Sequence, residues 1–449
     1  MKYLTHLLLP MIIFNSCQKN PNANTKKSDH HHTDYTILFQ RGDTVWVNDS
    51  IYTSAKGNHD LISYLPINNS NEHGYLFVSH ETMTIDSILG NGGGATIFEI
   101  EKQENKWQVK GRKKAIDFSE VGETVNNCGG KLTSKGTILM AEEICPTEKM
   151  HHPFFEKAKI DDLTNFGWIV EVNPSEGKAL HKCFAMGRFI HEDALSLPDG
   201  KTVFLTNDAS PAVFFKFIAD TPHDYTKGKL FAYNQHDSTN PWIELPQEKD
   251  SLVNTKKIAF RKGATLFCRH EWMTMVDGKI YITETGFDHI NWKKAIDLGA
   301  VPARHYSSYL KQNKYEYDDP YGRVLVFDPI KNTMEVYLEG NEKFSNPDCI
   351  TSFSKKGKDY LVVAEDIIGI DRGRSLENEW GNQLWALDLA IKDPNVEDLQ
   401  LLFKAPRGSE ITGNQVTPDG QSLFLNIQHP LTTNEPPFNR STTIVMQTP

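Results

Sequence analysis

A pattern of two apolar, strand-like runs joined by a glycine-containing turn occurs six times along the 449 residues of the chain. Each copy opens on an acidic residue or a cysteine and closes on a polar cluster. The openings are Asp60, Cys128, Glu192, Glu271, Asp348 and Glu410. Because the two strands of a hairpin run antiparallel, the opening and the closing residues lie at the same end of the sheet. Six such hairpins around one axis would gather about a dozen ligand atoms at one mouth.

The turns between the paired runs are expected to contain Gly74, Gly136, Gly200, Gly278, Gly357 and Gly420. Three of these glycines follow an aspartate, and Asp-Gly is a common hairpin signal because it supports a positive φ. We expect these turns to set the register of each repeat and to take no part in chemistry.

Further apolar alternation lies between the six hairpins, at residues 167–174, 212–220, 322–329 and 382–389. We interpret these runs as outer strands. No long helical periodicity separates the strands, which argues against a parallel α/β sheet. Helix-like patches occur in residues 145–166 and 285–320. The sequence therefore predicts an all-β fold, a six-bladed β-propeller with helical and loop insertions at the rim.

The N-terminus predicts export. Lys2, an apolar run at residues 7–14 and Cys17 are typical of a lipoprotein signal peptide covering residues 1–17, in which Cys17 is lipidated. A plain secretory signal with an incidental cysteine is the alternative. Residues 18–34 are polar and predict a flexible tether, and residues 35–449 are assigned to a single catalytic propeller domain. We expect an exported lipoprotein, periplasmic or at the cell surface and anchored to the membrane.

The net charge and the number of cysteines limit the functions that the chain can have. The formal net charge is -10, and a nucleic-acid partner would call for a basic surface. Five cysteines follow Cys17, so in an exported protein at least one must remain unpaired.

The opening and closing residues predict metal binding. Carboxylates are depleted in strands and costly to bury alone, so their recurrence calls for a cation, with a hydrated polar channel as the alternative. The Cys128 thiolate would favour iron or zinc, while surplus carboxylates suit calcium. The closing residues are Glu81, Glu142 with Glu143, Asn207 with Asp208, Glu284, Glu365 with Asp366, and Gln428 with His429. Arg269 is either a counter-ion for these acids or a clamp for a phosphate group.

Several segments resemble the PhoX-type alkaline phosphatases. They include NCGGKLTSKGTILMAEE from 127, GRFIHEDALSLPDG from 187, RHEWMTMVDGKIYIT from 269 and GSEITGNQVTPDGQSLFLNIQHP from 408. The resemblance extends from about residue 57 to about residue 430 and implies a six-bladed propeller that holds Fe3+ and Ca2+ at its axial mouth.

The resemblance also implies roles for individual residues. Cys128, Glu192 and Glu271 match iron ligands, and Arg269 matches an arginine that holds the substrate phosphate. The acidic positions of the cluster are matched by Glu81, Glu142, Glu143, Asp208, Asp348 and Glu410. The chain departs from the family pattern at Asp193, which replaces a glycine, and at His270, which replaces a proline and is expected to contact substrate.

We therefore predict a phosphoesterase that hydrolyses phosphate monoesters on an Fe3+/Ca2+ cluster. Arg269, Glu271 and Glu192 are the predicted catalytic residues, and the protein is expected to act as a monomer on small phosphate esters. Two alternatives remain open. One is a calcium-binding propeller without catalysis, and the other is a calcium-dependent lactonase or phosphotriesterase, whose site commonly needs no thiolate.

Overall fold

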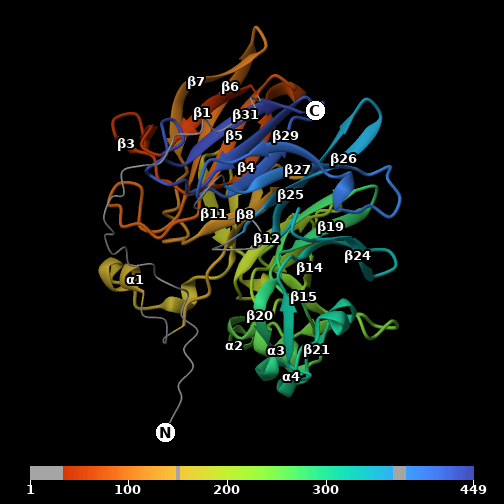
Figure 1. The fold of residues 1–449 in the computed structure, drawn as a ribbon. Coiled ribbons are helices and arrows are strands. Elements are labelled where there is room, and N and C mark those ends of the chain that lie inside the picture. The colour runs from red at the N-terminus through yellow and green to blue at the C-terminus, as the bar shows by residue number, and fades with distance from the viewer. Residues whose placement is uncertain (1–33, 148–151, 368–380, 449) are drawn as a thin grey trace, which may run out of the picture. The chain divides into compact units, whose positions relative to one another are not determined.

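Six antiparallel sheets account for most of the computed structural model, which describes residues 34–147, 152–367 and 381–448 (Figure 1). Blade 1 consists of β4 (His59–Pro66), β5 (His73–His80), β6 (Ala95–Gln103), β7 (Lys106–Ala115), β2 (Thr44–Trp46) and β3 (Tyr52–Ser54). Blade 2 consists of β8 (Asn127–Leu132), β9 (Ile138–Glu142), β10 (Ile169–Asn173) and β11 (Lys178–Lys182). Blade 3 consists of β12 (His191–Ser196), β13 (Thr202–Asn207), β14 (Phe215–Ala219), β15 (Gly228–Tyr233) and β16 (Trp242–Leu245).

The remaining three blades follow the same plan. Blade 4 consists of β18 (His270–Val276), β19 (Lys279–Glu284), β23 (Arg323–Asp328) and β24 (Thr333–Glu339). Blade 5 consists of β25 (Pro347–Lys355), β26 (Lys358–Glu365), β27 (Gln383–Asp388) and β28 (Gln400–Lys404). Blade 6 consists of β29 (Ile411–Val416), β30 (Ser422–Ile427), β31 (Thr442–Gln447) and β1 (Tyr35–Gln40).

The pairing of β1 with β31 closes the ring, because it completes the last blade with the first strand of the described chain. The inner strands contact one another in the cyclic order β4, β8, β12, β18, β25, β29 and back to β4. This arrangement confirms the predicted six-bladed β-propeller, in which each hairpin of the sequence repeat supplies the two innermost strands of one blade.

Side chains packed between neighbouring blades form the core. Every residue of β9 and of β30 is buried, because both faces of these strands are covered by adjacent sheets. Such strands appear in the sequence as nearly continuous apolar runs, which is why the repeat was recognisable.

Five of the six predicted turn glycines lie between paired strands with positive φ. Gly74 is the exception, because it lies within β5. The first hairpin instead turns through η1 (Ile67–Asn69), where Asn68 and Asn69 have positive φ of 52° and 57°. Asparagine tolerates this conformation better than most non-glycine residues, so no glycine is needed at this turn.

The insertions lie at the rim. The first contains α1 (Pro153–Ala158), and the second contains β20 (Phe287–Asn291), α4 (Lys293–Leu298), η4 (Arg304–Tyr309) and β22 (Glu316–Asp319). Two helices that the sequence analysis did not identify, α2 (Lys249–Val253) and α3 (Thr255–Arg261), lie close to α4 (Figure 1). Among the described residues, no helix combines the length and apolar composition needed to cross a membrane. The predicted signal peptide and nearly all of the predicted tether lie outside the described residues.

Candidate metal centre

A β-bulge occurs near the start of the inner strand in all six blades. In β12, for example, Glu192 and Asp193 together oppose a single residue of β13, because the pairing shifts between His191 and Ala194. Bulges redirect side chains and are frequent beside active sites. In five blades the first residue of the bulge is a candidate ligand, namely Asp60, Cys128, Glu192, Glu271 and Asp348.

Blade 6 differs, because Gly413 and Asn414 form its bulge. A Cβ atom on Gly413 would lie 2.1 Å from the backbone oxygen of Asp60, so no carboxylate fits there. Glu410 instead comes from the segment before β29, three residues before Gly413, which is the position equivalent to the bulge ligands of the other blades. The backbone oxygen of Glu410 accepts a hydrogen bond from Gln428 N at 3.0 Å.

The bulge residues meet side chains that follow the second strand of each hairpin. We call the following set the mouth cluster: Asp60, Glu81, Cys128, Glu143, Glu192, Asp208, Arg269, Glu271, Asp348, Asp366 and Glu410. Three groups within it each bring three ligand atoms within 4.8 Å of one another. The groups are Cys128 with Glu143 and Glu192, then Glu192 with Glu271 and Asp348, then Asp348 with Asp366 and Glu410. Because neighbouring groups share a residue, they form one continuous array that could hold metal.

Cys128 lies at one end of this array and is buried. Its Sγ is 3.1 Å from Glu192 Oε1 and 3.4 Å from Asp60 Oδ2. Burial raises the pKa of the Cys128 thiol well above its ordinary value, and the neighbouring carboxylates add to this effect. A thiol in these surroundings loses its proton readily only if a cation takes its place.

The carboxylates of the mouth cluster also resist ionisation. Burial raises the pKa of Glu192 well above its ordinary value, with Glu271 and Asp348 contributing further repulsion. Burial raises the pKa of Glu143 and of Glu410 in the same way, and each is also raised by a neighbouring carboxylate. Two buried oxygens of the cluster, Asp60 Oδ1 and Asp348 Oδ1, have no hydrogen-bond partner among the described residues. A polar group is rarely buried without a partner, so these oxygens fit a metal ion.

Arg269 is the only arginine or lysine of the mouth cluster. Its Nε donates to Asp208 Oδ1 at 2.8 Å, and its Nη2 lies 3.2 Å from Glu271 Oε1 and 3.4 Å from Asp366 Oδ2. Burial alone would raise the pKa of Asp208, but the charge and hydrogen bond of Arg269, together with hydrogen bonds from Glu143 and Glu271, outweigh burial and the pKa is lowered. Thr285 Oγ1 donates to Glu271 Oε1 at 2.7 Å and so helps to orient that carboxylate.

The backbone at Arg269 is strained, with φ of 55°. The equivalent position, two residues before the bulge ligand, is occupied by Asn58, Asn126 and Asn346 in three other blades, all with positive φ. Asparagine accepts this conformation readily, whereas a longer side chain costs about 1 kcal/mol or more. Blade 4 therefore has an arginine at a position where three other blades have an asparagine.

Several predicted residues lie outside the mouth cluster. The Glu142 carboxylate pairs with Lys182 Nζ at 3.1 Å and accepts hydrogen bonds from three backbone N–H groups, those of Val125, Gly167 and Trp168. Glu284 and Glu365 likewise accept bonds from backbone N–H groups within their own blades. The structure thus brings Glu143 and Asp366 to the mouth. The residues before them, Glu142 and Glu365, instead accept hydrogen bonds within their own blades.

His270 is also away from the mouth cluster. Its side chain is fully buried, and its ring centroid lies 4.1 Å from that of Phe267. Burial lowers the pKa of His270 to about 4. His191 is placed similarly, 3.6 Å from the Phe189 ring. In both of these blades the histidine before the bulge is buried against an aromatic ring, and this burial leaves His270 no access to substrate, contrary to the expected substrate contact.

The Asp193 side chain stabilises the contact between neighbouring blades. Its Oδ2 accepts from Met273 N at 2.8 Å and lies 3.2 Å from Lys131 Nζ, while its Oδ1 accepts from Ala194 N at 2.8 Å. It therefore joins the inner strands of blades 2, 3 and 4. A glycine at this position could make none of these contacts.

The resemblance to the PhoX-type phosphatases assigned no role to two cluster residues, Asp60 and Asp366. Both occupy repeat positions, since Asp60 opens the first hairpin and Asp366 closes the fifth. The repeat itself was the signal that could have identified them. All five cysteines in the described part of the chain are free thiols.

Comparison with known proteins agrees with this geometry. Residues 31–431 match the family described as alkaline phosphatase PhoX. The structure is similar to that of Pseudomonas fluorescens PhoX in complex with vanadate, a transition-state analogue, with a TM-score of 0.70 and 19% sequence identity over 94% of this chain and 96% of that chain. A Trypanosoma rangeli sialidase with the inhibitor DANA aligns at a TM-score of 0.46 and 10% identity, over 93% of this chain and 60% of that chain. No curated protein sequence matches. The chain belongs to the alkaline phosphatase PhoX family of phosphoric ester hydrolases.

Proposed function

We propose that this protein is an exported phosphomonoesterase that depends on iron and calcium bound at the mouth cluster. The observation that carries the proposal is the convergence of nine carboxylates and one thiol, from all six blades, in one cluster in which Arg269 pairs with three of the carboxylates. Without cations, so many buried acids would oppose folding.

The donor atoms suit two kinds of metal. Cys128, Glu143 and Glu192 combine a sulfur with oxygens, which favours iron or zinc over calcium, and the family resemblance selects Fe3+. Glu271 is next in the array through its group with Glu192. Asp348, Asp366 and Glu410 offer oxygens alone, which favours Ca2+. Glu81 accepts hydrogen bonds from Asn126 and Gln428 and extends the oxygen-rich side of the cluster. When bound, such ions would act as Lewis acids toward the phosphoryl oxygens.

Arg269 is the proposed phosphate clamp. Its guanidinium is held by Asp208 through Nε, so its orientation is set before substrate arrives. A guanidinium donates in a planar fork that matches two oxygens of a phosphoryl group. Because hydrogen bonds aimed at developing charge stabilise the transition state, a fixed Arg269 would lower the barrier as well as bind substrate. Glu192 and Glu271 would act as metal ligands in the group that they form with Asp348.

Export and lipidation rest on the N-terminal pattern alone. Lys2, the apolar run at 7–14 and Cys17 support a lipoprotein signal, and phosphatases of this family are typically exported. Labelling of expressing cells with a clickable fatty acid tests this, because Cys17→Ser should abolish labelling and release the protein from the membrane fraction.

Elemental analysis of protein purified without added metal tests the central proposal. We expect iron and calcium to co-purify, phosphate release from 4-nitrophenyl phosphate to stop after chelation, and both ions together to restore it. A protein free of iron that hydrolyses lactones or phosphotriesters with calcium alone would refute this assignment.

A further inference from the structure

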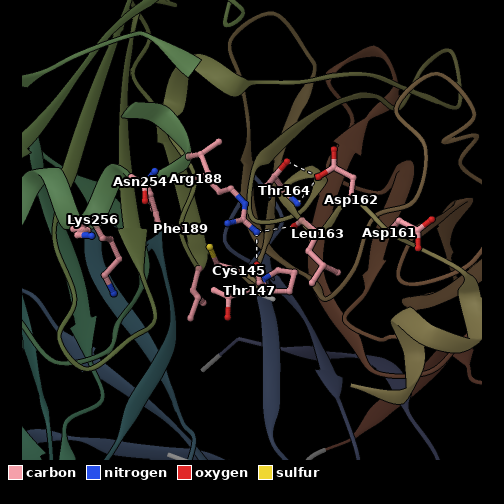
Figure 2. Close-up of a pocket in the computed structure, with 14 residues that line it drawn as sticks. Cys145, Thr147, Asp161, Asp162, Leu163, Thr164, Arg188, Phe189, Asn254 and Lys256 are labelled. Carbon is pink, nitrogen blue, oxygen red and sulfur yellow. Dashed lines mark hydrogen bonds between the residues drawn. The ribbon is translucent and has the colours of Figure 1, made fainter. Parts of the chain in front are cut away.

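A cavity of about 550 Å³ lies among the residues that Figure 2 draws as sticks. Its walls come from the insertion after β9, from the segment that leads into β12, and from α2 and α3. Its volume lies within the range of small-molecule binding sites. None of its lining residues belongs to the mouth cluster.

Three residues that line the cavity lie close to mouth-cluster residues, two of them along the chain and one through a hydrogen bond. The lining residue Cys145 is two positions after Glu143, and the lining residue Ile190 is two positions before Glu192. The lining residue Lys256 donates from Nζ to the backbone oxygen of Pro211 at 2.8 Å, three positions after Asp208. Two or three residues of extended chain span about 7 to 10 Å. A phosphate ester held at the mouth could therefore extend its leaving group into the cavity.

The cavity carries positive charge on the side of Lys256. Burial lowers the pKa of Lys256 to about 8, and the negative charges of Cys145 and Asp208 oppose this shift because they favour the ammonium form. Arg188, at the centre of the cavity, donates only to the backbone oxygens of Phe166, Pro146 and Leu163, and no carboxylate among the described residues pairs with it. Figure 2 shows Asp161 and Asp162 on the opposite side of Arg188 from Lys256.

Resting on the proposed phosphatase activity, we propose that this cavity receives the leaving group of the ester and favours leaving groups that carry their own negative charge. The charged group, a carboxylate or a second phosphate, pairs with the Lys256 ammonium. Leu163, Ile190 and Phe189 contact the carbon skeleton.

Matched substrates test this inference on the metal-loaded protein. One arm compares 3-phosphoglycerate with glycerol 1-phosphate, which differ in a carboxylate, and the other compares fructose 1,6-bisphosphate with fructose 6-phosphate. We expect kcat/KM to favour the charged member in at least one arm. Lys256→Met should reduce that preference about tenfold, and Lys256→Arg should retain it. Because the readout is a ratio, it does not depend on the fraction of protein that is folded.

Lys216→Met is the matched control. Lys216 on β14 is also partly buried, with its pKa lowered to about 8 by burial, but it lies over the Trp242 ring and lines no part of the cavity. This variant should keep the wild-type preference. Equal kcat/KM for both members of both pairs, or a preference unchanged by Lys256→Met, would overturn the inference while leaving the phosphatase proposal intact. Failure to hydrolyse 4-nitrophenyl phosphate as well as the four esters would instead reject the proposed function.

Discussion

Cys128 Sγ lies 3.1 Å from Glu192 Oε1, although the two residues are 64 positions apart and belong to different blades. Neither group is stable as a buried anion, since burial raises the pKa of both. Repulsion from Asp60 and Glu192 adds to the effect at Cys128, and repulsion from Glu271 and Asp348 adds to it at Glu192. A cation between them would reverse this balance, because it replaces the protons and attracts both anions. Substitution of one of these two residues is therefore the most direct test of metal binding.

Replacing the thiol should remove the metal with the strongest preference for sulfur. We expect Cys128→Ser to lose most of its iron and to lower kcat about 100-fold or more, because a hydroxyl is a poor substitute for a thiolate ligand. Elemental analysis and phosphate release measure the two effects. Cys183→Ser, which changes a buried free thiol outside the mouth cluster, is the control and should retain its iron. A Cys128→Ser protein with full iron content would contradict the assignment.

Arg269→Ala should lower kcat/KM for phosphate esters by about 100- to 1000-fold, which is typical for loss of one donor to developing charge. Inhibition by inorganic phosphate should weaken in parallel. Metal content should stay the same or rise, since the substitution removes a positive charge next to Asp208 and Glu271. Arg269→Lys should recover only part of the activity because an ammonium cannot form the planar fork. Unchanged inhibition by inorganic phosphate in Arg269→Ala would show that Arg269 only balances charge and does not hold the phosphate group.

Chelation should make the stability of the protein depend on pH. The raised pKa values of Glu143, Glu192 and Glu410 mean that the folded state without metal keeps protons that the unfolded state releases. This stabilising contribution is full below the ordinary carboxyl pKa of about 4 and is lost as pH rises through the raised values. We therefore expect the Tm of chelated protein to fall with increasing pH, and the Tm gained on adding metal back to grow. Thermal unfolding from pH 5 to pH 9 checks this, and a constant gain would contradict it.

Asp193→Gly restores the residue expected at this position from the family pattern, but it should destabilise this protein. The change removes the acceptors of Met273 N and Ala194 N and leaves Lys131 without its partner. A loss of about 2 to 4 kcal/mol follows from hydrogen bonds to a buried charge. Denaturant unfolding measures it, and Asp193→Asn, which retains an acceptor, should lose less. An equally stable Asp193→Gly protein would show that the three blades need no such link.

Acid should destabilise the protein through His270. Its pKa is about 4 in the folded state against about 6.5 when unfolded, so the unfolded state binds the proton first as pH falls. The penalty grows from pH 6.5 to pH 4 and reaches about 3 kcal/mol. His270→Leu should reduce the slope of unfolding free energy against pH across this range, while His236→Leu, an exposed histidine, should leave it unchanged. Equal slopes in the wild type and His270→Leu would contradict the predicted burial.

The number of blades followed from the sequence because each inner hairpin is buried on both faces and so appears as two apolar runs. The types of candidate ligand could be predicted from the sequence for a related reason. An acidic residue or a thiol at the start of a buried strand recurs only if something at that end of the sheet compensates it. Cys128, Glu192, Glu271 and Asp348 were identified in this way, and the structure places all four in the mouth cluster.

The sequence alone could not decide which member of each closing pair faces the mouth. Glu142 and Glu143 have the same chemistry, and only the strand register turns one toward Lys182 and the other toward Cys128. A one-residue shift exchanges the two faces of a strand, and bulges make such shifts without a clear sequence signature. The composition of the site was thus set by local sequence. Which of these residues face the site was set by pairing between strands, because the direction of a side chain depends on hydrogen bonds to residues far away in the chain.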